Sequence, residues 1–182
     1  MERIWNYIHY FIFQLEIKAT YFFRTILNFI FSPITKIKVF KKGLEKRNSS
    51  FKHIDDIALN LSNNPLYGKS IAFAGIHTGG LIILIEYGLF NILQTILGKT
   101  FMQFVWGSGN SYKWIFIIGL LAIPWIINEK LLFKNDKYLK YFDEFDKEPK
   151  EVRRKWAWIS FGIIIGIITF FVLSFVLLSR VY

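Results

Sequence analysis

The chain has no cysteine, and it has only four prolines and three histidines among 182 residues. The absence of cysteine excludes disulfides, thiolate metal sites and a cysteine nucleophile. The histidines lie far apart, at positions 9, 53 and 77, so we expect no metal site. Acidic residues are also scarce, thirteen against twenty-three lysines and arginines, which gives a formal net charge of +10.

Common enzyme signatures are missing as well. There is no phosphate loop of the GxxxxGKS or GxxxxGKT type, no HExxH zinc motif, no GxSxG nucleophile and no GxGxxG followed by an acidic residue. We therefore expect a protein without catalytic activity and without a cofactor.

Long apolar runs dominate what the chain does contain, since 53% of its residues are apolar and 19% are aromatic. Three runs are candidate transmembrane helices, although the second is shorter than the about 20 apolar residues that cross a hydrocarbon core of about 30 Å. They are residues 70–97, 114–127 and 156–179. Pro124 lies in the second and should kink it, which is tolerated where neighbouring groups satisfy the backbone. The predicted fold class is an all-α membrane protein with three transmembrane helices.

The distribution of positive charge predicts the topology. Eight basic residues lie in segment 36–69 and nine in loop 129–155, against two in the loop between the first two spans. Basic segments stay in the cytoplasm, so both should lie inside and the C-terminus outside. We divide the chain into an amphipathic helix with a basic cytoplasmic segment, 1–69, and a three-span membrane domain, 70–182, whose loop 129–155 is cytoplasmic. No cleavable signal peptide is evident, and richness in Ile, Phe, Lys and Asn favours a bacterial cytoplasmic membrane.

Residues 4–31 predict an amphipathic helix. Most of their apolar side chains project into one arc of about 120°, which suits a helix lying in the plane of the membrane interface. As a fourth span, this helix would place Glu16 and Lys18 near the bilayer centre, at about 2.5–3.5 kcal/mol each. We favour the interfacial helix and leave a fourth span as the alternative. Pro33 should end the helix, and a short helix should follow over 54–61.

Glu86 is the most informative single residue, because an acid in the middle of a span is a functional hypothesis by default. Gly75, Gly79 and Glu86 project within about 40° of one another, and a small-xxx-small pair lets another helix approach closely. We expect Glu86 to be protonated, to form a hydrogen bond with a group such as Thr169 or Ser174, or to gather around the axis of an oligomer. The alternative is a shorter span in which Glu86 lies near the outer headgroups.

The other residues of interest in the spans support helix packing. His77, the other intramembrane polar residue of interest in this helix, projects about 180° away from Glu86, so the two cannot form a proton relay within one helix. We predict that His77 is a packing residue whose hydrogen bonds are satisfied by its neighbours. Gly162 and Gly166 form a second GxxxG pair, in the third span. This pair is a candidate partner for the face that carries Gly75, Gly79 and Glu86.

The segment Arg47-Asn48-Ser49-Ser50-Phe51-Lys52-His53 resembles the R-x4-6-H motif of HEPN-type ribonucleases. In that family Arg and His act on a phosphodiester, so the resemblance implies a membrane-attached ribonuclease that uses Arg47 and His53. It also implies a likeness to the small membrane accessory proteins of type VI-B RNA-guided defence systems. The match covers seven residues, and Arg3 and His9 show the same spacing.

Clusters of cations beside the spans favour anionic lipid as the partner, at about 1 kcal/mol per residue, and make nucleic acid an unlikely one. The residues expected to contact lipid are Lys36, Lys38, Lys41, Lys42, Arg153, Arg154 and Lys155. The leading functional hypothesis is a non-enzymatic subunit or accessory protein of a membrane complex, immunity and defence roles included, which packs against itself or a partner. The alternatives are a homo-oligomeric pore with Glu86 at its polar site and, third, the ribonuclease.

Overall fold

The computed structural model describes residues 1–35, 41–42, 44, 46, 49–107, 109 and 111–180. Within these residues the chain is 90% helical and contains no strand. Lys36, Lys38 and Arg47, named above for lipid contact and for the nuclease motif, lie outside the described residues.

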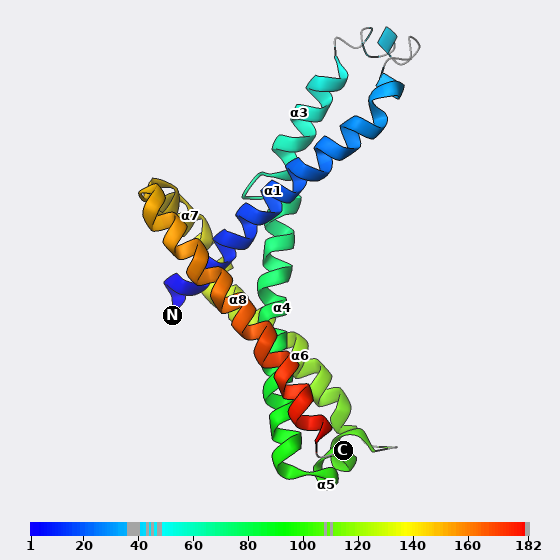
Figure 1. Cartoon of the computed structure of the whole chain (residues 1–182), viewed down its shortest axis with the longest axis vertical. Coiled ribbons are helices and arrows are strands. Elements are labelled where there is room, and N and C mark those ends of the chain that lie inside the picture. The colour runs from blue at the N-terminus through cyan, green and yellow to red at the C-terminus, as the bar shows by residue number, and fades with distance from the viewer. Residues whose placement is uncertain are drawn as a thin grey trace. The chain divides into compact units, whose positions relative to one another are not determined.

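Long helices make up most of the fold (Figure 1). They form two compact units, one of Met1–Phe11 with Gly75–Tyr182 and one of Ile12–Ala74, and each is described by itself below. The elements are α1 (Glu2–Thr35), α3 (Phe51–Ser62), α4 (Lys69–Leu97), α5 (Lys99–Trp106), α6 (Tyr112–Asn128), the π-helical turn η1 (Glu129–Phe133), the 3-10 turn η2 (Lys134–Asp136), α7 (Lys137–Lys147) and α8 (Lys150–Ser179).

Three helical stretches in the described part of the chain are long and apolar enough to cross a membrane. They are α4, the stretch from the start of α6 to the end of α7, and α8. Each contains one of the three predicted runs, and the second extends beyond its predicted run to Lys147. Helix α1 does not qualify by the same measure of length and composition. The short helix expected at 54–61 is also present, as α3.

The expectation that Pro33 ends the first helix is wrong, because α1 continues to Thr35 with Pro33 inside it. A proline removes one backbone donor, here the one that would bond to the carbonyl of Phe29. Near the end of a helix that single loss is tolerated, since few hydrogen bonds follow it.

In the first unit, the beginning of α1 is buried on all sides. Five consecutive residues, Asn6 to Tyr10, are buried, although a helix with one solvated face would expose some of them. Tyr7 lies between two rings of other helices, with centroid distances of 3.7 Å to Phe145 of α7 and 4.8 Å to Trp156 of α8. Stacked aromatic rings contribute beyond the area they bury, so these turns of α1 belong to the core of the unit.

Polar side chains at the edge of this core hold α1 to α7. Arg3 pairs with Glu144 and Glu148 at 2.9 Å. The hydroxyl of Tyr7 donates to Glu148 and that of Tyr10 donates to Asp146. Burial, together with the hydrogen bond to Asp146, raises the pKa of Tyr10 to about 12. Loop 129–155 contains helix α7, which α1 covers.

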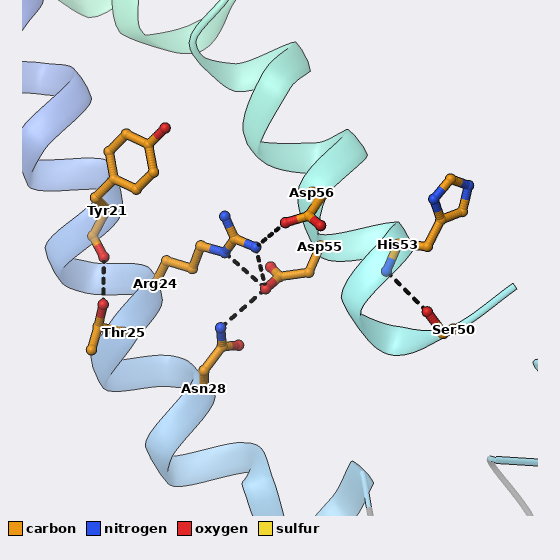
Figure 2. A network of polar contacts seen from close by, with 8 residues as sticks. All are labelled: Tyr21, Arg24, Thr25, Asn28, Ser50, His53, Asp55 and Asp56. Carbon is orange, nitrogen blue, oxygen red and sulfur yellow. Dashed lines mark hydrogen bonds and ion pairs between the residues drawn. The ribbon is translucent and has the colours of Figure 1, made fainter.

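In the second unit, α3 runs beside the later part of α1 (Figure 1). Figure 2 shows the polar network that joins them: Arg24 donates from Nε to Asp55 at 2.8 Å and from a terminal nitrogen to Asp56 at 2.9 Å, and Asn28 donates to Asp55 at 3.0 Å. The hydrogen bond from Arg24 lowers the pKa of Asp55 below its ordinary value, against a smaller opposing effect of burial. Ser50 caps α3 by accepting from the backbone N–H of His53.

The apolar stripe of this part of α1 remains uncovered. Its exposed members are Phe22, Phe23, Ile26, Phe29 and Ile30, and Ile54, Ile57 and Leu61 are exposed on α3. An uncovered apolar face flanked by charged residues is what an interfacial helix requires.

Candidate functional site

Helix α4 carries more buried polar residues than its apolar sequence suggests. Thr78, Asn91 and Gln94 are all buried, and Glu86 lies between them in the same helix. A polar group that is buried away from water needs a hydrogen-bond partner. The partners of these residues therefore show which helices meet α4, and at which point along its length.

Gly75 and Gly79 lie where α6 and η1 meet α4. A Cβ on Gly75 would lie 3.2 Å from the ring of Phe133, and a Cβ on Gly79 would lie 3.1 Å from Nδ2 of Asn128. The same Nδ2 donates to the carbonyl of Gly75 at 3.4 Å. At both glycines the approaching chain is that of α6 and η1.

The first turns of α1 complete this junction. Nε1 of Trp5 donates to Oδ1 of Asn128 at 3.2 Å, and Nδ1 of His9 forms a hydrogen bond of 3.0 Å with the hydroxyl of Thr78. Asn6 donates to the carbonyl of Leu131 at 3.1 Å. The sequence alone did not reveal this role for Asn6 and His9.

A second polar junction lies toward the other end of α4, against α8 and α5. Nδ2 of Asn91 donates to the hydroxyl of Ser174 at 3.0 Å. Gln94 donates to Oδ1 of Asn91 at 3.4 Å and accepts from Nε1 of Trp106 at 3.2 Å. A Cβ on Gly88 would lie only 2.5 Å from the ring of Phe170, so Phe170 of α8 packs closely against α4 at this point.

Glu86 joins neither junction. Both of its carboxyl oxygens are buried, and neither has a hydrogen-bond partner among the residues that the structure describes. The expected bond to Thr169 or Ser174 is therefore wrong, and the hydroxyl of Ser174 instead accepts from Asn91 and donates to the carbonyl of Phe171. The reason is rotational, because Glu86 and Asn91 are five residues apart and so point about 140° apart around α4.

The side of α4 that carries Glu86 is the side that meets α6. Glu86 projects between Gly75 and Gly79, both of which meet the α6–η1 chain. The two helices run in opposite directions, with Gly79 beside Asn128 and the rings of Phe90 and Phe116 3.9 Å apart. Counting between these two contacts places Glu86 level with Leu120, inside the apolar part of α6.

The remaining predicted residues do not gather at this site. His77 lies on the exposed part of α4, away from Glu86. Gly162 and Gly166 are exposed, and a Cβ on either would meet no atom within 4 Å. The expectation that they pack against the face with Gly75, Gly79 and Glu86 is wrong, because α6 occupies that face.

The predicted lipid-binding cations differ in their surroundings. Arg153 is half-buried beside the hydroxyl of Tyr10, whereas Arg154 and Lys155 are exposed, as are Lys41 and Lys42. In the described part of the chain, no group of three or more His, Asp or Glu side chains is placed to hold a metal ion.

Comparisons with models of protein families, with curated proteins and with solved structures gave no match. The function must therefore be argued from this chain alone.

Proposed function

We propose that the protein is a non-enzymatic, multi-pass protein of the bacterial cytoplasmic membrane that acts through helix packing as a subunit of a membrane complex. Its C-terminus lies outside, and its exposed cations contact the anionic inner leaflet. The observation that carries the proposal is the open row of glycines on α8, to which the chain itself supplies no partner helix among the described residues.

This row continues the surface through which α8 meets α4. Gly162, Gly166, Phe170 and Ser174 follow one another at intervals of four, so they form one ridge of α8. The ridge touches α4 at Phe170 and Ser174, but it meets nothing at the two glycines. Gly80, at the same level of α4, is likewise open. Gly162 and Gly166 therefore lie on a part of α8 that no described residue of the chain covers closely.

Small residues four apart are the surface through which membrane helices approach one another most closely. In lipid, apolar side chains gain little by leaving the bilayer, so close backbone contact supplies much of the association energy. A helix of a partner protein, or of a second copy, fits this requirement better than a lipid chain does.

The experiment is purification in a mild detergent from native membranes, followed by determination of the mass of the complex. Replacing Gly162 and Gly166 together by leucine should release the protein as a monomer. The matched control is Gly119→Leu, since Gly119 of α6 is also open but has no glycine four residues away. If the double variant keeps the wild-type mass, or if the wild type is already a monomer, the proposal is wrong. Identifying the co-purified chain separates self-association from a foreign partner.

Two alternatives receive less support. Glu86 faces α6 of its own chain, so its position does not favour a residue that lines a pore at an oligomer axis. For the ribonuclease, His53 lies in the first turn of α3, where its backbone N–H donates to Ser50, and Arg47 lies outside the described residues. We therefore keep the subunit as the proposed function.

A further inference from the structure

Helix α6 has a backbone carbonyl without its usual donor at the level of Glu86. Pro124 lies inside α6 and is buried. A proline has no N–H, so the carbonyl four residues earlier, that of Leu120, loses its helical hydrogen bond. In lipid such a carbonyl must be satisfied from a neighbouring group.

Glu86 is the group at that level. It projects toward α6, its two oxygens are buried, and they have no partner among the described residues. An ionised carboxylate would repel a carbonyl oxygen, whereas a protonated carboxyl carries one O–H donor. The two unsatisfied groups complement each other only when Glu86 holds a proton.

The spans of α6 and α8 contain no charged side chain that could change the protonation of Glu86. Residues 114–127 of α6 and 156–179 of α8 contain no Lys, Arg, Asp, Glu or His. On α4 itself, the titratable side chains within the span are His77, which points about 180° away, and Tyr87, whose ring lies against Phe171 and Phe175 of α8.

We propose that Glu86 is a proton-binding site whose carboxyl donates a hydrogen bond to the carbonyl of Leu120, released by Pro124, and so joins α4 to α6. The ligand of this site is a proton, and the hydrogen bond exists only while the proton is bound. Deprotonation leaves two buried oxygens facing each other, which weakens the contact between the two helices. This role goes beyond the proposed assembly function and does not depend on it.

The first test is infrared spectroscopy of the full chain in lipid vesicles at neutral pH. We expect a band of a protonated carboxylic acid that is missing in Glu86→Gln and that shifts when Pro124 is replaced by alanine. The alanine N–H would bond the carbonyl of Leu120 and so remove the acceptor for Glu86. If Glu86→Gln removes only a carboxylate band, the proposal is overturned.

The second test measures the coupling between Glu86 and Pro124 by unfolding in detergent. Glu86→Leu should change the unfolding equilibrium by about three- to tenfold in the natural background, the range expected for one hydrogen bond between membrane helices. The effect should be smaller in the Pro124→Ala background, where the acceptor is already occupied. Glu86→Gln should retain most of the stability, since an amide N–H also donates. The stability of the wild type should decrease as rising pH deprotonates Glu86, and the stability of Glu86→Gln should not show this decrease. An equal effect of Glu86→Leu in both backgrounds overturns the proposal. If Pro124→Ala does not fold, the infrared comparison of wild type with Glu86→Gln decides.

Discussion

Gly75 and Gly79 of α4 and Gly162 and Gly166 of α8 have the same spacing but different surroundings. The first pair is covered by other side chains: a Cβ on Gly75 would lie 3.2 Å from the ring of Phe133, and a Cβ on Gly79 would lie 3.1 Å from the amide nitrogen of Asn128. The second pair meets nothing within 4 Å. Their spacing tells where a helix can approach. It does not tell whether the same chain supplies that helix, and this difference is the basis for assigning α8 the contact with a partner.

The largest expected effect concerns Gly88 of α4, which lies against the ring of Phe170 of α8. Gly88→Leu would place a Cβ 2.5 Å from the ring of Phe170 and extend the side chain further into it. Overfilled contacts of this kind cost about 1–3 kcal/mol, and this variant should lie at the upper end of that range. Unfolding in detergent, followed by circular dichroism, measures the change in free energy. A wild-type unfolding midpoint would mean that α8 does not rest on Gly88.

The second prediction compares the two glycine pairs directly. Gly79→Leu should lower the free energy of unfolding by about 1–3 kcal/mol, because Asn128 is held by Trp5 and cannot move aside without losing hydrogen bonds. Gly162→Leu should leave the stability of the isolated chain within about 0.5 kcal/mol of wild type, as an uncrowded surface change does. Equal effects of the two variants would mean that the covered pair, Gly75 and Gly79, does not differ from the uncovered pair, Gly162 and Gly166.

The third prediction concerns the hydrogen bond from Trp5 to Asn128, the side chain that lies against Gly79. Trp5→Phe keeps the aromatic ring but removes the Nε1 donor to Asn128. One acceptor at the α4–α6 junction then loses its partner, which should cost about 1 kcal/mol. Trp158→Phe is the matched control, since Trp158 is an exposed tryptophan of α8. The same free-energy change in both variants would show that the hydrogen bond contributes nothing.

Hydrophobic patterning was enough to predict the helical class and the positions of α4, α6 and α8, because a run of some twenty apolar residues has few alternatives. Helix partners could not be predicted in the same way. The pairing of Asn91 with Ser174, and of Trp5 with Asn128, depends on how the helices are rotated about their axes and shifted along one another, which the apolar periodicity leaves open. The hydrogen bond expected from the sequence between Glu86 and Thr169 or Ser174 was wrong for this reason.

The start of α1 shows a different limit. The helical periodicity of residues 4–31 predicts one apolar side that suits a membrane surface, and residues 22–30, later in the helix, do leave an apolar stripe exposed. Asn6 and His9 are nevertheless buried, because α7 and η1 provide acceptors and aromatic rings around them. No local pattern indicates that another segment, more than a hundred residues later, will supply this environment.

The last prediction concerns the link between α1 and α7 at Tyr10. The pKa of this phenol is about 12 in the folded chain and 10 for an ordinary tyrosine, so the fold favours the protonated phenol. Its contribution to stability should be complete below pH 10 and should be lost as the pH rises from 10 through about 12. Tyr10→Phe removes this contribution at every pH, so the difference in unfolding free energy between wild type and variant should shrink over that interval. Because both proteins contain the same lysines and the same other tyrosines, their difference isolates Tyr10. A difference that stays constant through pH 12 would mean that the bond to Asp146 does not distinguish the phenol from the phenolate, and that aromatic stacking alone holds the first turns of α1 against α7.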